Sequence, residues 1–386
     1  MPQDIVFSFF LIFAGALVLA TFALYTRQPI LVAYIALGAI AGPYGMGWIE
    51  HPDELTDMAH IGIIFLLFLL GLDMQPSSLF AVLKKAMSVA LLSSLLFFGV
   101  GAGVTHLLGY GFMDAIIVGL ALMFSSTIIG LKLLPTTVLH HKHSGELMVG
   151  LLLIQDMIAI LTLILLGVLS GDSDQPVWQP FLALPLLAAA CYLIVKLILL
   201  PLIQRFDRYQ EYLFIMAIGW CLAVAEAAAV IGLSEEIGAF IAGVTLATSP
   251  IAQFMAISLK PLRDFFLVMF FFTLGAGVNL GMLEEVLVGA VLLAGAVLTL
   301  KPLTFRVLLG RFSETPKLAW DVGFRLGQIS EFSLLVVFVA IESALLTERA
   351  SLLVQATAII TFVLSSYIVV FNYPNPIAIS DKLRRD

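Results

Sequence analysis

Hydrophobic residues occur in long runs, separated by short polar stretches, from one end of the 386-residue chain to the other. Most runs hold about 20 residues, which is the length an α-helix needs to cross the hydrocarbon core of a bilayer. Short alternating strands, the pattern of a membrane β-barrel, are not visible in the sequence. The pattern therefore predicts an all-α polytopic membrane protein.

The runs predict about thirteen transmembrane helices. They lie near residues 4–26, 29–48, 58–73, 86–108, 112–134, 146–170, 179–204, 210–231, 236–249, 264–281, 286–309, 318–341 and 350–371. The first run has no basic segment before it, so we predict a true span rather than a cleavable signal peptide. The connecting stretches are short, and no separate soluble domain is predicted.

The charged residues support the membrane class and predict the orientation of the protein in the bilayer. Only 12% of the residues are charged, against roughly 25% in a soluble domain. Basic residues in loops or at the ends of runs occupy alternate loops: Arg27, Lys84, Lys85, Lys132, Lys142, Arg205, Arg208, Lys260, Arg263, Arg306, Arg311, Lys317, Lys382, Arg384 and Arg385. Only Arg349 falls in the other set of loops. The positive-inside rule then predicts an external N-terminus and a cytoplasmic C-terminus in a prokaryotic-type inner membrane.

A carboxylate lies deep in the apolar segment 145–170, where Asp156 follows Gln155. A charge at mid-bilayer costs about 2.5 kcal/mol or more, so it needs a cavity, a counter-charge or a bound cation. The other charges singled out within predicted spans, away from the basic loops, are Lys196, Lys301 and Arg325 and, well inside spans, Glu226 and Glu331.

Two predicted spans carry polar and small residues at their middles. One contains Phe124-Ser125-Ser126-Thr127 followed by Gly130, and the other contains Gly327-Gln328-Ile329-Ser330-Glu331. Such clusters are typical of broken helices, although small-residue helix packing is an alternative for each. The two spans are seven apart, which inverts their orientation. The layout therefore predicts inverted six-helix repeats with two discontinuous crossing helices, joined by the span at 179–204.

The residues near Asp156 suggest ion chemistry. Asp156, Gln155, Ser126 and Thr127 offer oxygen ligands suited to a hard monovalent cation, and the absence of a neighbouring thiolate or imidazole disfavours a transition metal. A nonpolar environment favours the neutral form of a carboxyl group. Asp156 could then hold either a proton or a cation near neutral pH, each excluding the other. The alternative is a structural ion pair between Asp156 and Lys301 or Lys196.

Lys301, Glu331 and Arg325 are predicted to balance charge in the core. Lys301 is five residues from Arg306 and could instead extend toward the headgroups. Arg325 and Glu331 are six residues apart, too far for an ordinary i,i+4 pair, but across a break they could neutralise each other or the helix ends.

Several motifs resemble one known family. They are Gly42-Pro-Tyr-Gly45, Phe68-Leu-Leu-Gly-Leu-Asp73, Ser125-Ser-Thr127, Leu152-Leu-Ile-Gln155-Asp156, Ile237-Gly-Ala-Phe-Ile-Ala-Gly243, Phe272-Thr-Leu-Gly-Ala-Gly277 and Gly327-Gln-Ile-Ser-Glu-Phe332. Together they resemble the Kef-type potassium/proton antiporters of the second monovalent cation:proton antiporter family. The sequence departs from the Kef pattern at Leu161, Glu235 and Glu236.

The resemblance implies the Na⁺/H⁺-exchanger-like fold and a homodimer that works by an elevator-like movement. It implies scaffold helices in 1–75 and 210–281, a mobile core in 86–170 and 286–371, a linker helix at 179–204 and a cytoplasmic tail at 372–386. It also implies that Asp156 is the ion-binding acid and that Gln155, where sodium-moving relatives often carry a second acid, favours potassium. Kef systems continue into a cytoplasmic nucleotide-binding domain, so either this protein has no such control or a domain or subunit outside this chain supplies it.

The leading hypothesis is a secondary antiporter that exchanges K⁺, or alternatively Na⁺, for H⁺ within the lipid bilayer, without a cofactor or a nucleic-acid partner. A gated K⁺ channel is an alternative from another class. An intramembrane enzyme finds no support, because paired aspartates, a Ser/His pair and an HExxH motif are all missing from the sequence.

Overall fold

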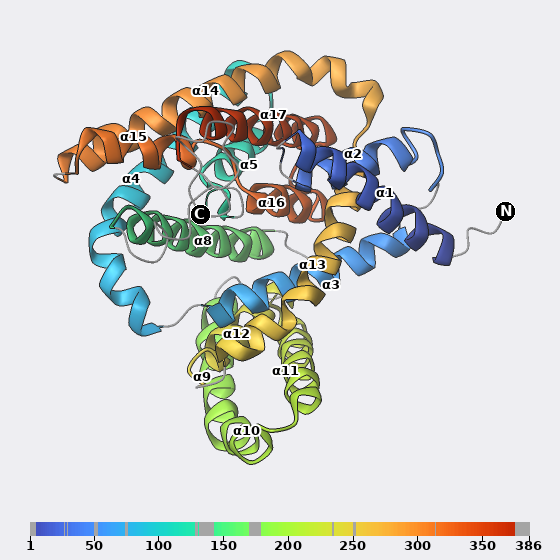
Figure 1. The fold of residues 1–386 in the computed structure, drawn as a ribbon, viewed down its shortest axis with the longest axis vertical. Coiled ribbons are helices and arrows are strands. Elements are labelled where there is room, and N and C mark those ends of the chain that lie inside the picture. The colour runs from blue at the N-terminus through green and yellow to red at the C-terminus, as the bar shows by residue number, and fades with distance from the viewer. Residues whose placement is uncertain are drawn as a thin grey trace. The chain divides into compact units, whose positions relative to one another are not determined.

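The computed structural model describes residues 5–26, 28, 30–49, 53–73, 76–127, 130, 143–169, 179–233, 235–249, 252–312 and 314–374, and throughout these residues the secondary structure is helical without strands. The helices are α1 (Ile5–Tyr25), α2 (Ile30–Ala41), α3 (Asp53–Asp73), α4 (Pro76–Leu107), α5 (Phe112–Leu122), α8 (His143–Leu169), α9 (Gln179–Ile194), the π-helical η1 (Val195–Leu199), α10 (Leu200–Phe206), α11 (Gln210–Val230), α12 (Glu235–Leu246), α13 (Ala252–Ala276), the 3₁₀-helical η2 (Leu280–Met282), α14 (Leu283–Arg311), α15 (Pro316–Arg325), α16 (Glu331–Glu342) and α17 (Glu348–Asn372). Figure 1 shows their arrangement.

Seven helices in the described part of the chain are long and apolar enough to cross a membrane. They lie within α1, α4, α8, α9–α10, α11, α14 and α17. The outer faces of several are apolar: on the continuous helix from α9 to α10, for example, Leu186 is 69% exposed and Leu197 is 68% exposed. Apolar surface of this kind is stable against lipid tails but not against water. The protein is therefore an integral membrane protein.

By internal contacts the chain divides into two units, which we describe separately. The first comprises Met1–Glu50, Ala81–Leu163 and Leu274–Asp386, and the second comprises His51–Phe80 and Ile164–Thr273. This division by contacts does not test the functional division into a scaffold and a mobile core, which stays a prediction.

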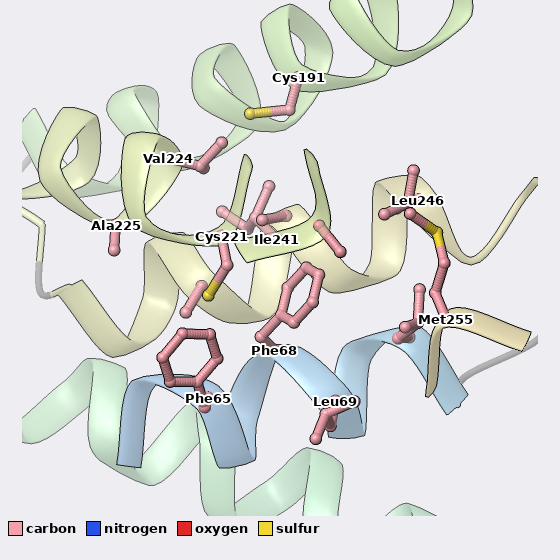
Figure 2. Packing of buried hydrophobic residues seen from close by; sticks show 14 of the residues in the cluster. Phe65, Phe68, Leu69, Cys191, Cys221, Val224, Ala225, Ile241, Leu246 and Met255 are labelled. Carbon is pink, nitrogen blue, oxygen red and sulfur yellow. The ribbon is translucent and has the colours of Figure 1, made fainter. Parts of the chain in front are cut away.

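The second unit has one hydrophobic core, built by α3 and α9–α13 (Figure 2). Phe65 and Phe68 of α3 contribute two of its largest buried side chains. The free cysteines Cys191 and Cys221 are both buried in this core. Helices α3 and α12 approach closely at glycines, since a Cβ atom on Gly71 would lie 2.5 Å from the carbonyl oxygen of Phe240.

The first unit has a core in which side chains of α4, α8, α14 and α15 pack together. Phe97 of α4 meets Phe305 of α14 edge to face, with 5.8 Å between ring centroids. Helices α14 and α15 come together at Gly323, where a Cβ atom would lie 2.8 Å from the Cα atom of Pro302. Figure 1 shows α5, α16 and α17 side by side in this unit, and these helices contact one another.

Several helix boundaries differ from the prediction, and α4, for example, begins at Pro76 rather than near 86. Helix α13 begins at Ala252 rather than near 264, so Lys260, Pro261 and Arg263 lie inside a helix. Apolar run length detects only the part of a helix at hydrocarbon depth, and a helix that continues into the polar region is missed at that end. The second predicted span ends early, because α2 stops at Ala41 and turns follow it.

Candidate ion-binding site

The first predicted break is present between α5 and Thr127. Helix α5 ends at Leu122, and residues Phe124, Ser125 and Ser126 have no helical conformation. The carbonyl groups at this helix end have lost their i+4 partners and need hydrogen bonds from elsewhere. The predicted continuation of the span beyond residue 130 lies outside the described residues.

The second predicted break separates α15 from α16. Helix α15 ends at Arg325, and α16 begins at Glu331 behind a capping box formed by Ser330 and Ser333. The Ser333 hydroxyl also donates to the carbonyl oxygen of Ala121, near the end of α5. The Gln328 amide lies 3.5 Å from the carbonyl oxygen of Ser126. The two interrupted helices therefore meet at their breaks.

Side chains of helix α17 form hydrogen bonds with residues of the second break. Ser365 donates to the side-chain oxygen of Gln328 at 2.8 Å, and Thr361 accepts from the backbone amide of Ile329 at 3.4 Å. Both hydroxyls are buried. These contacts fix the direction in which Gln328 presents its amide.

Lys301 of α14 connects the two breaks. Its ammonium donates to the carbonyl oxygens of Phe124 in the first break and Gln328 in the second, and it lies 3.3 Å from the Ser125 hydroxyl. The side chain is 1% exposed, and its ammonium lies 5.1 Å from the ring centroid of Phe97. The side chain is thus directed into the core rather than toward a surface. Its charge faces the negative ends of two half-helices, where a cation is favoured.

Asp156 and Gln155 lie on α8 next to the first break, and both are buried. The Thr127 hydroxyl lies 3.4 Å and 3.3 Å from the two carboxylate oxygens of Asp156. The Gln155 side-chain oxygen accepts the backbone amide of Ser125 at 3.1 Å. Within the described residues, the Gln155 amide nitrogen has no hydrogen-bond partner. The structure thus brings together three of the four predicted ligands, Asp156, Gln155 and Thr127, while the fourth, Ser126, is buried beside them in the same break.

Lys301 and Asp156 are both described, and no ion pair joins them. The ammonium binds carbonyl and hydroxyl oxygens instead. The carboxylate is thus not locked to this permanent basic neighbour.

Glu331 is a second acidic group near Asp156 that sequence reasoning did not place there. It is the first residue of α16, is 5% exposed, and its charge acts on the Asp156 carboxyl group. A carboxylate at a helix N-terminus is favoured by the helix dipole. The position of Glu331 at the start of the second half-helix was readable from the sequence, but its approach to Asp156 depends on the crossing of the two breaks.

Arg325 has an acidic partner, Asp321, that the sequence analysis did not name. Its Nε donates to Asp321 at 2.8 Å, an i,i+4 pair on α15, and its Nη2 donates to the carbonyl oxygen of Pro374 at 2.7 Å. The side chain is 2% exposed. Lys196, which was a possible partner for Asp156, is exposed on η1 and lies 5.9 Å from the ring centroid of Tyr192.

A polar cluster at the opposite end of α5 was not predicted. Asp114 accepts the backbone amide of Thr347 at 3.0 Å and its hydroxyl at 2.9 Å, and so ties the first turn of α5 to the N-cap of α17. Nearby, the Arg349 guanidinium lies 5.0 Å from the ring centroid of Tyr110. Burial raises the pKa of Tyr110, although Arg349 opposes this shift. The phenol is therefore neutral at physiological pH.

The described residues contain no group of three or more His, Cys, Asp or Glu side chains arranged to hold a metal ion. The oxygen donors around Asp156 are instead of the kind that suits an alkali cation or a proton. Two interrupted helices that cross beside a buried carboxylate are a layout typical of membrane transporters.

Comparison with known proteins gives the family. The family model for the sodium/hydrogen exchanger transmembrane domain matches residues 9–371, and the chain belongs to this family. The resemblance to Kef-type antiporters of the monovalent cation:proton antiporter family is confirmed.

Two similar curated proteins are from Arabidopsis thaliana. K(+) efflux antiporter 5 is 31% identical over 353 residues, and K(+) efflux antiporter 4 is 30% identical over 348 residues. Each alignment covers 87% of this chain but only 61% and 58%, respectively, of the relative. The chain therefore spans about three fifths of the length of these relatives.

A solved structure shares the fold. The sodium proton antiporter MjNhaP1 from Methanocaldococcus jannaschii aligns with a TM-score of 0.69, over 96% of this chain and 99% of that chain, at 16% identity. The predicted Na⁺/H⁺-exchanger-like fold is thus confirmed.

Proposed function

We propose that this protein is a secondary antiporter, rather than an enzyme, that exchanges a monovalent cation for a proton, with K⁺ as the main cation. The observation that carries the proposal is the buried Asp156 carboxyl group, which lies beside two broken helices and has no ion pair with Lys301 among the described residues. The names of the similar Arabidopsis proteins support potassium.

The proposed mechanism is competition at Asp156. In the cation-bound state, the ionised carboxylate and the oxygens of Thr127, Gln155 and Ser126 would replace part of the hydration shell of the ion. In the proton-bound state, the neutral carboxyl group would exclude the cation. Because each ligand must leave before the other binds, a gradient of one drives the other.

Alternating access would follow an elevator movement in which the core helices carry Asp156 across a dimeric scaffold. The alternation of basic loops supports an external N-terminus and a cytoplasmic C-terminus in a prokaryotic-type inner membrane. The relatives extend well beyond the matched region, which agrees with control by a cytoplasmic domain or subunit outside this chain.

The deciding experiment measures proton movement in proteoliposomes. A pH gradient is imposed, and dequenching of a pH-sensitive dye is recorded after addition of K⁺, Na⁺, Li⁺ or Rb⁺. We expect the largest response with K⁺. A larger response with Na⁺ would assign the protein as a Na⁺/H⁺ antiporter, and no response to any cation would contradict antiport.

Asp156→Asn tests the mechanism, because it keeps the size of the side chain and removes the titrating group. We expect loss of coupled exchange, whereas the exposed Asp207→Asn should behave as the wild type. If the proton and the cation share one site, the apparent KM for K⁺ should rise by up to about tenfold for each unit that pH falls. A K⁺ flux that persists in Asp156→Asn without proton movement would indicate a channel.

A further inference from the structure

Arg325 has a buried position that ordinary charge balance does not explain. Asp321 alone could neutralise it, yet the guanidinium also reaches 49 residues along the chain to the carbonyl oxygen of Pro374. The Tyr373 ring centroid lies 5.9 Å from the same guanidinium and 5.7 Å from the Phe324 ring centroid. The C-terminal end of α17 is thus fastened to the last turn of α15.

The residue after Arg325 enters the second break. The Leu326 carbonyl oxygen accepts the Ser125 hydroxyl at 2.9 Å. The Ser125 backbone amide in turn donates to the Gln155 side chain at 3.1 Å, and Gln155 precedes Asp156. Three hydrogen bonds and the covalent bonds between them therefore lead from Pro374 to the residue beside the ion-binding acid.

We propose that Arg325 is a positioning residue of the ion site. By fastening α15 to the end of α17, it fixes the direction of the Leu326 carbonyl and, through Ser125, the orientation of Gln155. Cation affinity at the site then depends on the position of Tyr373 and Pro374, the residues that follow α17. This inference rests on the proposed function, because it assigns Gln155 to the cation site.

The chemistry of the contact requires arginine. A guanidinium offers Nε and Nη2 in a fixed plane, so it can hold Asp321 and the Pro374 carbonyl at once, whereas an ammonium is a single point donor. Tyr373 presents a neutral ring to the cation, because burial and the Asp321 charge raise its pKa, against the opposing effect of Arg325. Proximity of a neutral aromatic face to a guanidinium is favourable.

The test compares Arg325→Gln and Arg325→Lys with Arg311→Gln, an exposed arginine at the end of α14. In proteoliposomes, we expect Arg325→Gln to raise the KM for K⁺ about fivefold, the equivalent of one hydrogen bond, with a smaller change in maximal rate. Arg325→Lys should be intermediate, and Arg311→Gln unchanged. A purely structural role would instead lower the amount of active protein and leave KM unaltered.

Ser125→Ala tests whether the effect of Arg325 reaches Gln155 through the hydrogen bond between Ser125 and Leu326. It removes the bond to the Leu326 carbonyl, so its effect on KM and that of Arg325→Gln should not add in the double variant. Additive effects, or an unchanged KM in Arg325→Gln, would overturn the inference. Asp321→Asn, which leaves the Pro374 contact in place, provides a milder variant should Arg325→Gln fail to fold.

A second readout does not depend on transport. Hydrogen exchange of the Ser125 amide reports its bond to Gln155 directly, and we expect it to accelerate about fivefold in Arg325→Gln, less in Arg325→Lys and not at all in Arg311→Gln. Unchanged exchange would refute the positioning role even if the wild type transported no cation. Accelerated exchange in a protein without antiport would retain the structural link and reject the proposed function.

Discussion

Lys301 is a buried cation whose partners are backbone carbonyls rather than an acid. One side-chain nitrogen bonds to the carbonyl of Phe124 in the first break and that of Gln328 in the second, and both residues lie beyond the end of a helix. Leaving such a group without a partner in a nonpolar interior costs about 1–3 kcal/mol. The hydrogen bonds of Lys301 therefore stabilise an arrangement that lipid-exposed backbone could not adopt.

We predict that Lys301→Met weakens both breaks together. The substitution preserves length but leaves two carbonyl groups unsatisfied, so the free energy of unfolding should fall by about 2 kcal/mol or more. Thermal unfolding in detergent gives the stability, and hydrogen exchange at residues 121–127 and 326–330 gives its location. Lys196→Met, at an exposed position on η1, should change neither. Faster exchange in only one break would show that Lys301 does not link them.

The sequence can single out residues whose chemistry resides in their side chains, and the ion-binding roles assigned to them stay predictions. Asp156, Gln155 and Thr127 stood out because oxygen-bearing side chains are costly within an apolar run. Carbonyl groups such as those of Phe124, Leu326 and Pro374 leave no such mark, since every residue has one. The Arg325–Asp321 pair has an i,i+4 spacing that can be read from the sequence. Glu331, the acid at the second break, was nevertheless the partner that the sequence analysis considered for Arg325.

At the scale of elements, apolar run length located the helices, and clusters of Ser, Gln and Gly located both interruptions. Helix α5 stops at Leu122 and α15 at Arg325, within a few residues of the predicted breaks. The run length could not give the full extent of α13, because Lys260, Pro261 and Arg263 interrupt the apolar run inside the helix. It also could not show which helices touch, since the helices are apolar on several faces and such faces select no single partner.

Close contact between α14 and α15 leads to a prediction about glycine. We expect Gly323→Ala to destabilise the protein by about 1–3 kcal/mol, because its methyl group would overlap the backbone at Pro302, next to Lys301. The matched variant Gly295→Ala lies in α14 with no atom within 4 Å of its added Cβ. It should be neutral or stabilising by about 0.5–1 kcal/mol, since glycine weakens a helix interior. Equal thermal stability of the two variants would argue against the tight contact.

At the scale of the whole molecule, the sequence predicted the class, the broken-helix layout and the family. The contact between the breaks depends on pairs such as Lys301 and Phe124, which are 177 residues apart. Such pairs follow from three-dimensional packing and have no periodicity that a single sequence displays. Orientation is the opposite case, because the distribution of basic loops along the sequence predicts it directly.

The two ends of α14 provide a test of this orientation. Glu284 and Arg311 are exposed residues at the first and last turns of one continuous helix, and the positive-inside rule places Arg311 in the cytoplasm. In a background in which the buried Cys191 and Cys221 are replaced by alanine, Glu284→Cys should react with a membrane-impermeant maleimide in intact cells. Arg311→Cys should react only after the membrane is permeabilised. Reversed labelling would invert the topology, and labelling of both from outside would show that α14 does not cross the bilayer.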